Sequence, residues 1–138
     1  ERYILKQQPS NMYKEQLESL FNEYRLKHKM FVYNNVNKAF SARLSNIQYF
    51  EVYVRTIIVH VFDGDNKSFD FYGKLSELEG AYAADGFVRV GKSYLVNISN
   101  IKHIDKDGLY MMNGDYISMG RSVRAKVIEA YMDYLSGR

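Results

Sequence analysis

The stretch FVRVGKSYLVN, residues 87–97, decides the fold, because it has two incompatible interpretations. Gly86, Gly91, Lys92 and Ser93 match the pattern G-x-x-x-x-G-K-S of phosphate-binding loops. Such a loop follows a strand and opens a helix, so that unpaired backbone amides converge on phosphate. Here FVRV and SYLVN both favour strands, and the helical pattern precedes the motif. The stretch therefore predicts two strands joined by a turn, and a phosphate-loop nucleotide-binding protein is the weaker interpretation.

Most of the chain from Lys29 onward continues this strand-and-turn pattern. A helix is predicted over residues 74–84, and the segments predicted as strands are KMFVY, KAFSA, IQYFEVYV, RTIIVHVF, SFDFYG, FVRV, SYLVN, NIKHID, GLYMM and DYISM. Short connections between consecutive strands favour antiparallel pairing and exclude a doubly wound nucleotide-binding fold. The body of the chain is therefore predicted to be mostly antiparallel β.

The C-terminal part carries turn signals and a helical stripe. Asp107-Gly108 and Asn113-Gly114 predict tight type I′ turns, so the last two strands should form a hairpin. A final helix is predicted from about Ser122. One stripe of it carries Val123, Val127, Tyr131, Tyr134 and Leu135.

Residues 1–28 have a different character from the rest. Pro9, Ser10 and Asn11 are residues that start helices, and an apolar stripe follows at helical spacing: Tyr13, Leu17, Leu20, Phe21 and Tyr24. This pattern predicts an N-terminal helix. Two origins stay open for it, a helix that belongs to the domain and a linker from an upstream domain.

Composition limits the class of protein. The 138 residues suffice for one domain with a hydrophobic core, and 46% hydrophobic and 15% aromatic residues argue against disorder. No apolar run approaches the roughly 20 residues that a membrane-spanning helix needs. The absence of cysteine excludes a disulfide framework and is consistent with a cytoplasmic protein.

Candidate catalytic and metal-binding residues do not form a recognisable set. His28, His60 and His103 lack the spacing of metal ligands. The loop beginning at Asp63 is similar to a calcium loop, but Lys74 occupies the twelfth position, where a bidentate Glu is required. We therefore predict no catalytic residues, no metal, no cofactor and no enzymatic activity.

The positive charge lies toward the C-terminus. Residues 87–138 carry eight Lys or Arg against five Asp or Glu, within a net charge of +3. Arg121, Arg124 and Lys126 fall in or beside the start of the last helix, where the helix dipole disfavours cations. A bound anion such as nucleic-acid phosphate would offset that cost. The alternative is that one arginine pairs with Asp115 or Glu129.

Residues 87–97 also resemble the signature F-x-R-x-H-R-S-y-l-V-N of the LytTR DNA-binding domain, although Gly91 replaces the usual His and Lys92 the commoner Arg. Further matching segments follow in family order, and the resemblance covers roughly residues 29–136. They are Ile47, Tyr49, Phe50 and Glu51 near the start, Tyr72 to Glu79 at a helix entry, Ile101 and Ile104 in a strand, and Gly120 to Lys126 near the end.

The resemblance implies an elongated fold of small antiparallel β-sheets with short helices. It also implies sequence-specific binding of double-stranded DNA from loops between strands, with side chains in successive major grooves and the intervening minor groove. Candidate DNA-binding residues are Arg55, Thr56, Arg89, Lys92, Ser93, Arg121, Ser122, Arg124 and Lys126. For Arg89, bracing its loop and holding phosphate both stay open, and Asn97 is expected to be structural.

The resemblance further implies a cytoplasmic response-regulator transcription factor with this domain as its output half. RYILK is similar to the last strand of a receiver domain, so residues 1–28 are predicted to be a receiver tail and linker, and residues 29–138 the DNA-binding domain. A cognate histidine kinase and a homodimer on paired promoter repeats are the implied partners. The alternative function is a protein-interaction β module with an incidental basic surface.

Overall fold

The computed structural model describes residues 29–137, and the predicted N-terminal helix and receiver tail lie outside them. The described part contains two α-helices, α3 (Leu75–Tyr82) and α4 (Arg121–Leu135). The 3-10 helices are η1 (Leu44–Asn46), η2 (Ala83–Asp85) and η3 (Ile98–Asn100). The strands are β1 (Met30–Asn34), β2 (Ala39–Arg43), β3 (Ile47–Tyr53), β4 (Thr56–Phe62), β5 (Asn66–Tyr72), β6 (Phe87–Val90), β7 (Tyr94–Asn97), β8 (Ile101–Ile104), β9 (Gly108–Met111) and β10 (Tyr116–Ser118).

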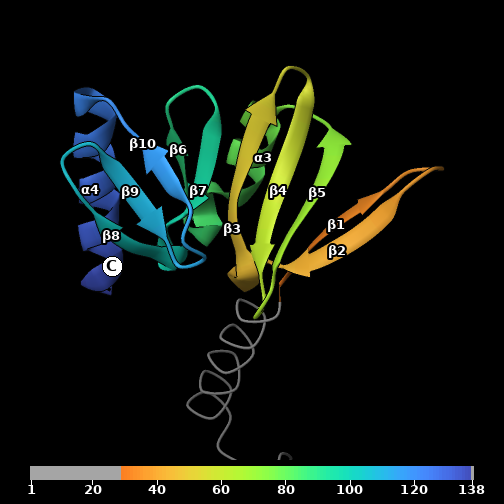
Figure 1. Cartoon of the computed structure of the whole chain (residues 1–138), viewed down its shortest axis with the longest axis horizontal. Coiled ribbons are helices and arrows are strands. Elements are labelled where there is room, and N and C mark those ends of the chain that lie inside the picture. The colour runs from red at the N-terminus through yellow and green to blue at the C-terminus, as the bar shows by residue number, and fades with distance from the viewer. Residues whose placement is uncertain (1–28, 138) are drawn as a thin grey trace, which may run out of the picture.

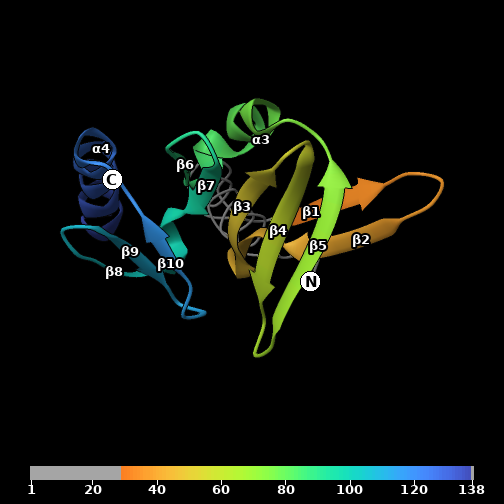
Figure 2. The same cartoon turned by 45° about the horizontal axis from the view of Figure 1, so that its top comes forward.

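The strands form two sheets and a separate hairpin, and every pairing is antiparallel. The larger sheet has the order β5-β4-β3-β7-β6, the smaller sheet has the order β10-β9-β8, and β1 pairs with β2. Figure 1 and Figure 2 show the smaller sheet and α4 beside the β6–β7 end of the larger sheet, with the hairpin beside β5. This arrangement confirms the predicted elongated, mostly β fold. None of the helices within residues 29–137 has the length and apolar character needed to cross a membrane.

Strand β3 lies in the middle of the larger sheet and separates two hydrophobic cores. Its successive side chains point to opposite faces, because the side-chain period of a strand is two. Phe50 lies opposite Leu95 and belongs to the first core, whereas Tyr49 lies opposite Val96 and belongs to the second. Burial on both faces explains why consecutive residues are buried in both strands, residues 47–50 in β3 and 95–97 in β7.

The first core packs the β1–β2 hairpin and α3 against one face of the larger sheet. The ring of Phe31 in the hairpin meets the ring of Phe50 edge-on, with centroids 5.3 Å apart. The buried members of this core are Phe31, Ala42, Leu44, Ile47, Phe50, Ile57, Val59, Val61, Phe71, Leu75, Phe87 and Leu95.

The second core packs the smaller sheet and α4 against the opposite face. A polar contact closes its edge, because the Tyr49 hydroxyl donates to Asp115 Oδ2 over 2.9 Å. Burial, followed by this hydrogen bond to a carboxylate, raises the pKa of Tyr49 and keeps the phenol protonated. The buried members are Tyr49, Val90, Val96, Ile98, Ile101, Leu109, Met111, Ile117 and Val127.

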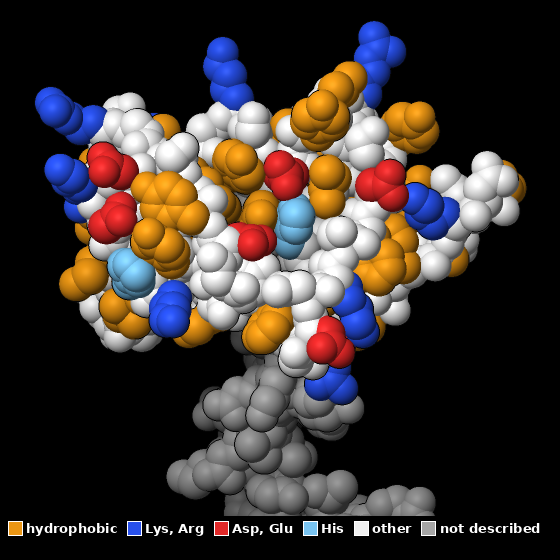
Figure 3. Space-filling model, in the orientation of Figure 1, with side chains coloured by type: hydrophobic (Ala, Val, Ile, Leu, Met, Phe, Trp, Pro, Cys, Tyr) orange, Lys and Arg blue, Asp and Glu red, His pale blue; other side chains and the backbone are white. Residues whose placement is uncertain are grey.

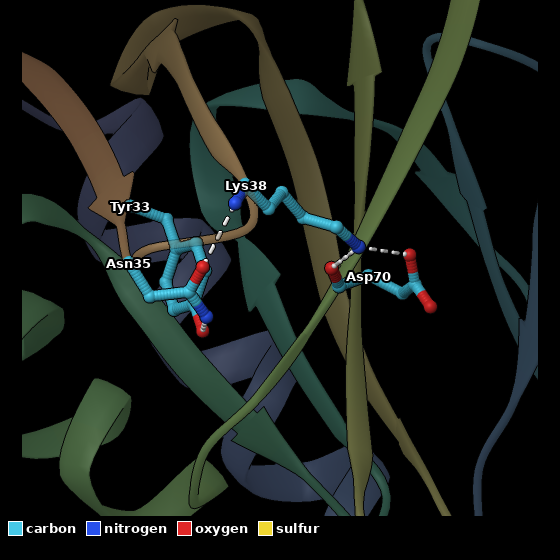
Figure 4. Close-up of polar contacts among 4 residues, drawn as sticks. All are labelled: Tyr33, Asn35, Lys38 and Asp70. Carbon is cyan, nitrogen blue, oxygen red and sulfur yellow. Dashed lines mark hydrogen bonds and ion pairs between the residues drawn. The ribbon is translucent and has the colours of Figure 1, made fainter.

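The turn of the β1–β2 hairpin is held by its own polar groups and by strand β5. Asn35 Oδ1 accepts from the Lys38 backbone amide over 2.8 Å, and Asn35 Nδ2 donates to the Tyr33 hydroxyl over 2.8 Å (Figure 4). Lys38 Nζ reaches across to the carboxylate and the carbonyl oxygen of Asp70, over 2.8 and 2.7 Å. The hydrogen bond from Lys38 holds the pKa of the Asp70 carboxyl below its usual value. These contacts orient the hairpin against the larger sheet.

Asn97 is buried and links the two cores through hydrogen bonds. This agrees with the structural role predicted for it. Its Nδ2 donates to the carbonyl oxygens of Leu44 and Ile47, over 3.1 and 3.0 Å. Its Oδ1 accepts from the backbone amide and the hydroxyl of Ser99, so Asn97 caps the N-terminus of η3. One side chain therefore satisfies backbone groups of η1, β3 and η3.

The predicted type I′ turns are wrong, although the predicted β9–β10 hairpin is confirmed. A type I′ turn requires positive φ at both central residues, and of these four residues Gly114 has one, 97°. Asp105 instead turns the chain before β9, because its Oδ1 accepts from the amides of Asp107 and Gly108. Gly108 has a different reason to be glycine: a Cβ there would lie 2.3 Å from the carbonyl oxygen of Ile117.

The predicted apolar stripe of the last helix is confirmed in its first half and wrong in its second. Val127 is fully buried and Val123 and Tyr131 pack against the second core. Tyr134 and Leu135 are 49% and 58% exposed. The helix therefore buries its stripe only as far as Tyr131.

Candidate nucleic-acid interface

The turn between β3 and β4 consists of two residues, Val54 and Arg55, because Tyr53 and Thr56 form the last pair of the ladder. Arg55 is exposed and Thr56 half-exposed. Val54 has a φ of 59°, the one positive φ at a non-glycine position within residues 29–137. The long ladder of seven-residue strands behind this turn projects it as a rigid tip.

The turn between β6 and β7 presents Lys92 on a three-residue loop that Gly91 begins with a φ of 67°. Lys92 is exposed and Ser93 half-exposed. The carbonyl oxygen of Ser93 accepts a hydrogen bond from the Val52 amide over 2.9 Å, which fastens this loop to the end of β3. Strand β7 follows the G-K-S sequence directly. A helix N-terminus is needed there for a phosphate-binding loop, so that interpretation is wrong.

Arg89 holds this loop from behind. Its Nη1 contacts Glu79 Oε1 of α3 over 2.8 Å, and its Nη2 donates to the carbonyl oxygen of Lys92 over 3.1 Å. Its Nε is buried and has no hydrogen-bond partner within residues 29–137. Two roles were left open for Arg89, bracing its loop and holding phosphate. The contacts favour bracing, because Nη1 and Nη2 bond to the protein and Nε is buried.

The start of α4 is an uncapped helix N-terminus with cations around it. Gly120 occupies the cap position without a side-chain hydrogen bond, and the first turn contains no acidic residue. The first α-helical bond runs from the Arg124 amide to the Gly120 carbonyl, which leaves the earlier amides without intrahelical partners. Arg121 and Ser122 are exposed there, and Lys126 is exposed one turn later. Such an end attracts anions, and each nearby cation costs about 0.3–1 kcal/mol until an anion arrives.

Arg124 is oriented by the β8–β9 loop. Its Nε donates to the carbonyl oxygen of Asp105 over 2.8 Å, and its two terminal nitrogens form no hydrogen bond within residues 29–137. Hydrogen bonds from the amides of Asp107 and Gly108 are the main reason that the pKa of the Asp105 carboxyl is lowered. Within the described residues, neither Arg121 nor Arg124 forms a salt bridge with an acidic side chain, so the alternative pairing with Asp115 or Glu129 is wrong.

The three segments meet at one edge of the molecule. Figure 1 shows the β3–β4 turn, the β6–β7 turn and the start of α4 along the upper edge, although they come from distant parts of the sequence. Figure 3 shows Lys and Arg side chains projecting from this edge, with Asp and Glu side chains lower on the visible face. We call this the basic edge, with Arg55, Lys92, Arg121 and Arg124 as its cations.

Two residues beside these segments were not predicted. Lys106 is exposed in the β8–β9 loop, next to the Asp105 carbonyl that holds Arg124. Lys106 lies between Asp105 and Asp107 in the sequence. The local net charge is therefore not positive and does not indicate an anion-binding residue. Val54 is apolar, and its residue type gives no sign of the positive φ that it adopts.

Comparisons with known proteins identify the family and the fold. The family model of the LytTr DNA-binding domain matches residues 37–132. A solved structure with the same fold is the LytTr DNA-binding domain of a protein described as a methyl-accepting/DNA response regulator from Bacillus cereus. It aligns with a TM-score of 0.59 and 22% identity over 79% of this chain and 97% of that domain. No curated protein matches the sequence closely enough to be reported as a relative. The family match spans well over half of the sequence, and the chain therefore belongs to the LytTR family of DNA-binding domains.

Proposed function

We propose that the basic edge binds double-stranded DNA and reads its sequence. The observation that carries this proposal is the convergence of three separately anchored segments, each with at least one exposed cation. Each segment is fixed by the fold: Arg55 by the β3–β4 ladder, Lys92 by Arg89 and Ser93, and Arg124 by Asp105. Segments whose backbone is already fixed lose little freedom on binding and can therefore present their side chains to base edges.

The wider role that we propose is that of an output domain in a two-component response regulator. An upstream receiver domain, phosphorylated by a histidine kinase, would promote a homodimer that occupies paired promoter repeats in the cytoplasm. The family membership supports this context. The direct test of the core proposal is whether the chain enriches one sequence from a random pool of duplexes.

Lys92→Ala should weaken binding to the selected duplex by about 1–3 kcal/mol if Lys92 contacts a base. Its exposed position means that folding should be unchanged. We would measure affinity for the selected and a random duplex at several salt concentrations. Equal losses on both duplexes, with a salt slope reduced by about one, would make Lys92 a phosphate contact instead.

Arg124→Ala and Arg121→Ala should have different effects, although the two residues share one helical turn. Because Asp105 holds Nε, the terminal nitrogens of Arg124 are oriented to bond O6 and N7 of guanine together. We expect Arg124→Ala to lower affinity for the selected duplex by about 1–3 kcal/mol and to relax selection at one base pair.

Arg121 serves as the matched variant, since it is exposed and has no such support. Arg121→Ala should weaken binding to selected and random duplexes alike, because a phosphate contact carries no sequence information. The reverse result, with selectivity lost in Arg121→Ala and retained in Arg124→Ala, would assign base reading to Arg121.

A further inference from the structure

Val54 has a backbone conformation that its side chain disfavours. Its φ of 59° lies in the left-handed region, which glycine and asparagine adopt readily and which is exceptional for β-branched residues. A two-residue hairpin turn of this kind normally carries glycine or asparagine at such a position. Strained positions persist where the surrounding structure imposes them, and they concentrate at functional sites.

Packing does not account for valine at this position. The residue is 81% exposed and belongs to neither hydrophobic core. The preceding Tyr53 is 69% exposed, so two consecutive residues at the tip of a long hairpin expose apolar surface. The turn therefore combines strain with unburied apolar surface, and neither stabilises the fold.

The position of the turn suggests what covers this surface. Val54 adjoins Arg55, and the hydrogen bond from Val52 to Ser93 places the turn beside the loop that carries Lys92. Figure 3 shows hydrophobic side chains reaching this upper edge beside a Lys or Arg side chain. A duplex seated on the basic edge would therefore meet an apolar side chain next to Arg55.

We propose that Val54 is a specificity-determining residue that contacts the C5-methyl group of a thymine. This inference rests on the proposed function. The thymine methyl is the apolar group that base edges display in the major groove, and a valine side chain has no donor or acceptor for the other bases. The contact would bury the exposed Val54 side chain on binding. It would also explain why a strained, apolar residue stands at the tip of the turn.

The test uses the selected duplex and its copies in which thymines are replaced, one at a time, by deoxyuridine, which lacks only the methyl group. For the unmodified chain, one replacement should weaken binding roughly three- to fivefold, the loss expected for one buried methyl group. Val54→Gly should bind the thymine and deoxyuridine duplexes equally, and should melt at the same or a higher temperature because glycine relieves the strain.

Val36→Gly is the matched control. Val36 is 98% exposed in the β1–β2 turn, which lies away from the basic edge (Figure 1), so this variant should retain the deoxyuridine effect. A selected duplex on which no deoxyuridine replacement weakens binding overturns the inference and leaves the proposed function standing. Retention of the full effect in Val54→Gly overturns it as well. A chain that selects no sequence from a random pool overturns both proposals.

Discussion

Val96→Asp is expected to lower the free energy of unfolding by about 4 kcal/mol or more, which approaches the whole stability of a typical domain. Val96 is fully buried in the second core and lies on a strand with paired neighbours on both sides. A carboxyl group there has no charged or hydrogen-bonding partner, whether it is ionised or protonated. Denaturant unfolding followed by far-ultraviolet circular dichroism suits the measurement, since the chain contains no tryptophan.

Val36→Asp is the control for this substitution, because it makes the same chemical change at a position that is 98% exposed. Its free energy of unfolding should stay within about 0.5 kcal/mol of the unmodified value, as is usual for surface positions. If Val96→Asp melted like the unmodified chain, the placement of the Val96 side chain in the second core would be wrong.

Asn97→Ala is expected to destabilise the domain by about 2–4 kcal/mol, although it removes few atoms. The substitution removes two donations to the carbonyl oxygens of Leu44 and Ile47, and it leaves the Ser99 amide without its hydrogen-bond partner. The two carbonyl oxygens keep their bonds from the Ile47 amide and from Asn100 Nδ2. Each of the hydrogen bonds that Asn97 makes contributes about 0.5–1.5 kcal/mol, and all of them are lost together from a buried side chain. The melting temperature should fall by roughly 10 °C.

Ser99→Ala separates this effect from a general loss of polar contacts at η3. It removes one hydroxyl, which donates to Asn97 Oδ1, and leaves the donations from Nδ2 intact. The expected destabilisation is about 0.5–1.5 kcal/mol. Equal effects of the two substitutions would show that Asn97 does not join the cores in the way described.

The strands and the pairing of consecutive ones were accessible from sequence because local patterns determine antiparallel neighbours, whereas the pairing of β3 with β7 joins distant segments and was not predicted. Runs rich in apolar and β-branched residues indicated the strands, and short connections between them favoured antiparallel pairing. The two tight turns were misassigned because Asp and Gly are shared by several turn types. At Asp105 a side chain replaced the backbone geometry that the Asp107-Gly108 pair suggested.

The candidate site was only partly accessible. Arg55, Lys92 and Arg124 were identified as candidates, but their position on one edge depends on the sheet order and could not be derived from spacing. The bracing contacts of Arg89 with Glu79 depend on how α3 packs behind β6. The positive φ of Val54 is a consequence of ladder register, which brings Tyr53 and Thr56 into the last pair.

The most direct test of sequence-specific recognition is selection from a random pool of duplexes at near-physiological salt, with the folded state of the chain checked by circular dichroism. Because phosphate contacts alone weaken steeply with salt and ignore sequence, enrichment under these conditions reports base recognition. We predict enrichment of one repeated sequence. A folded chain that binds every duplex equally, or none, would contradict the account.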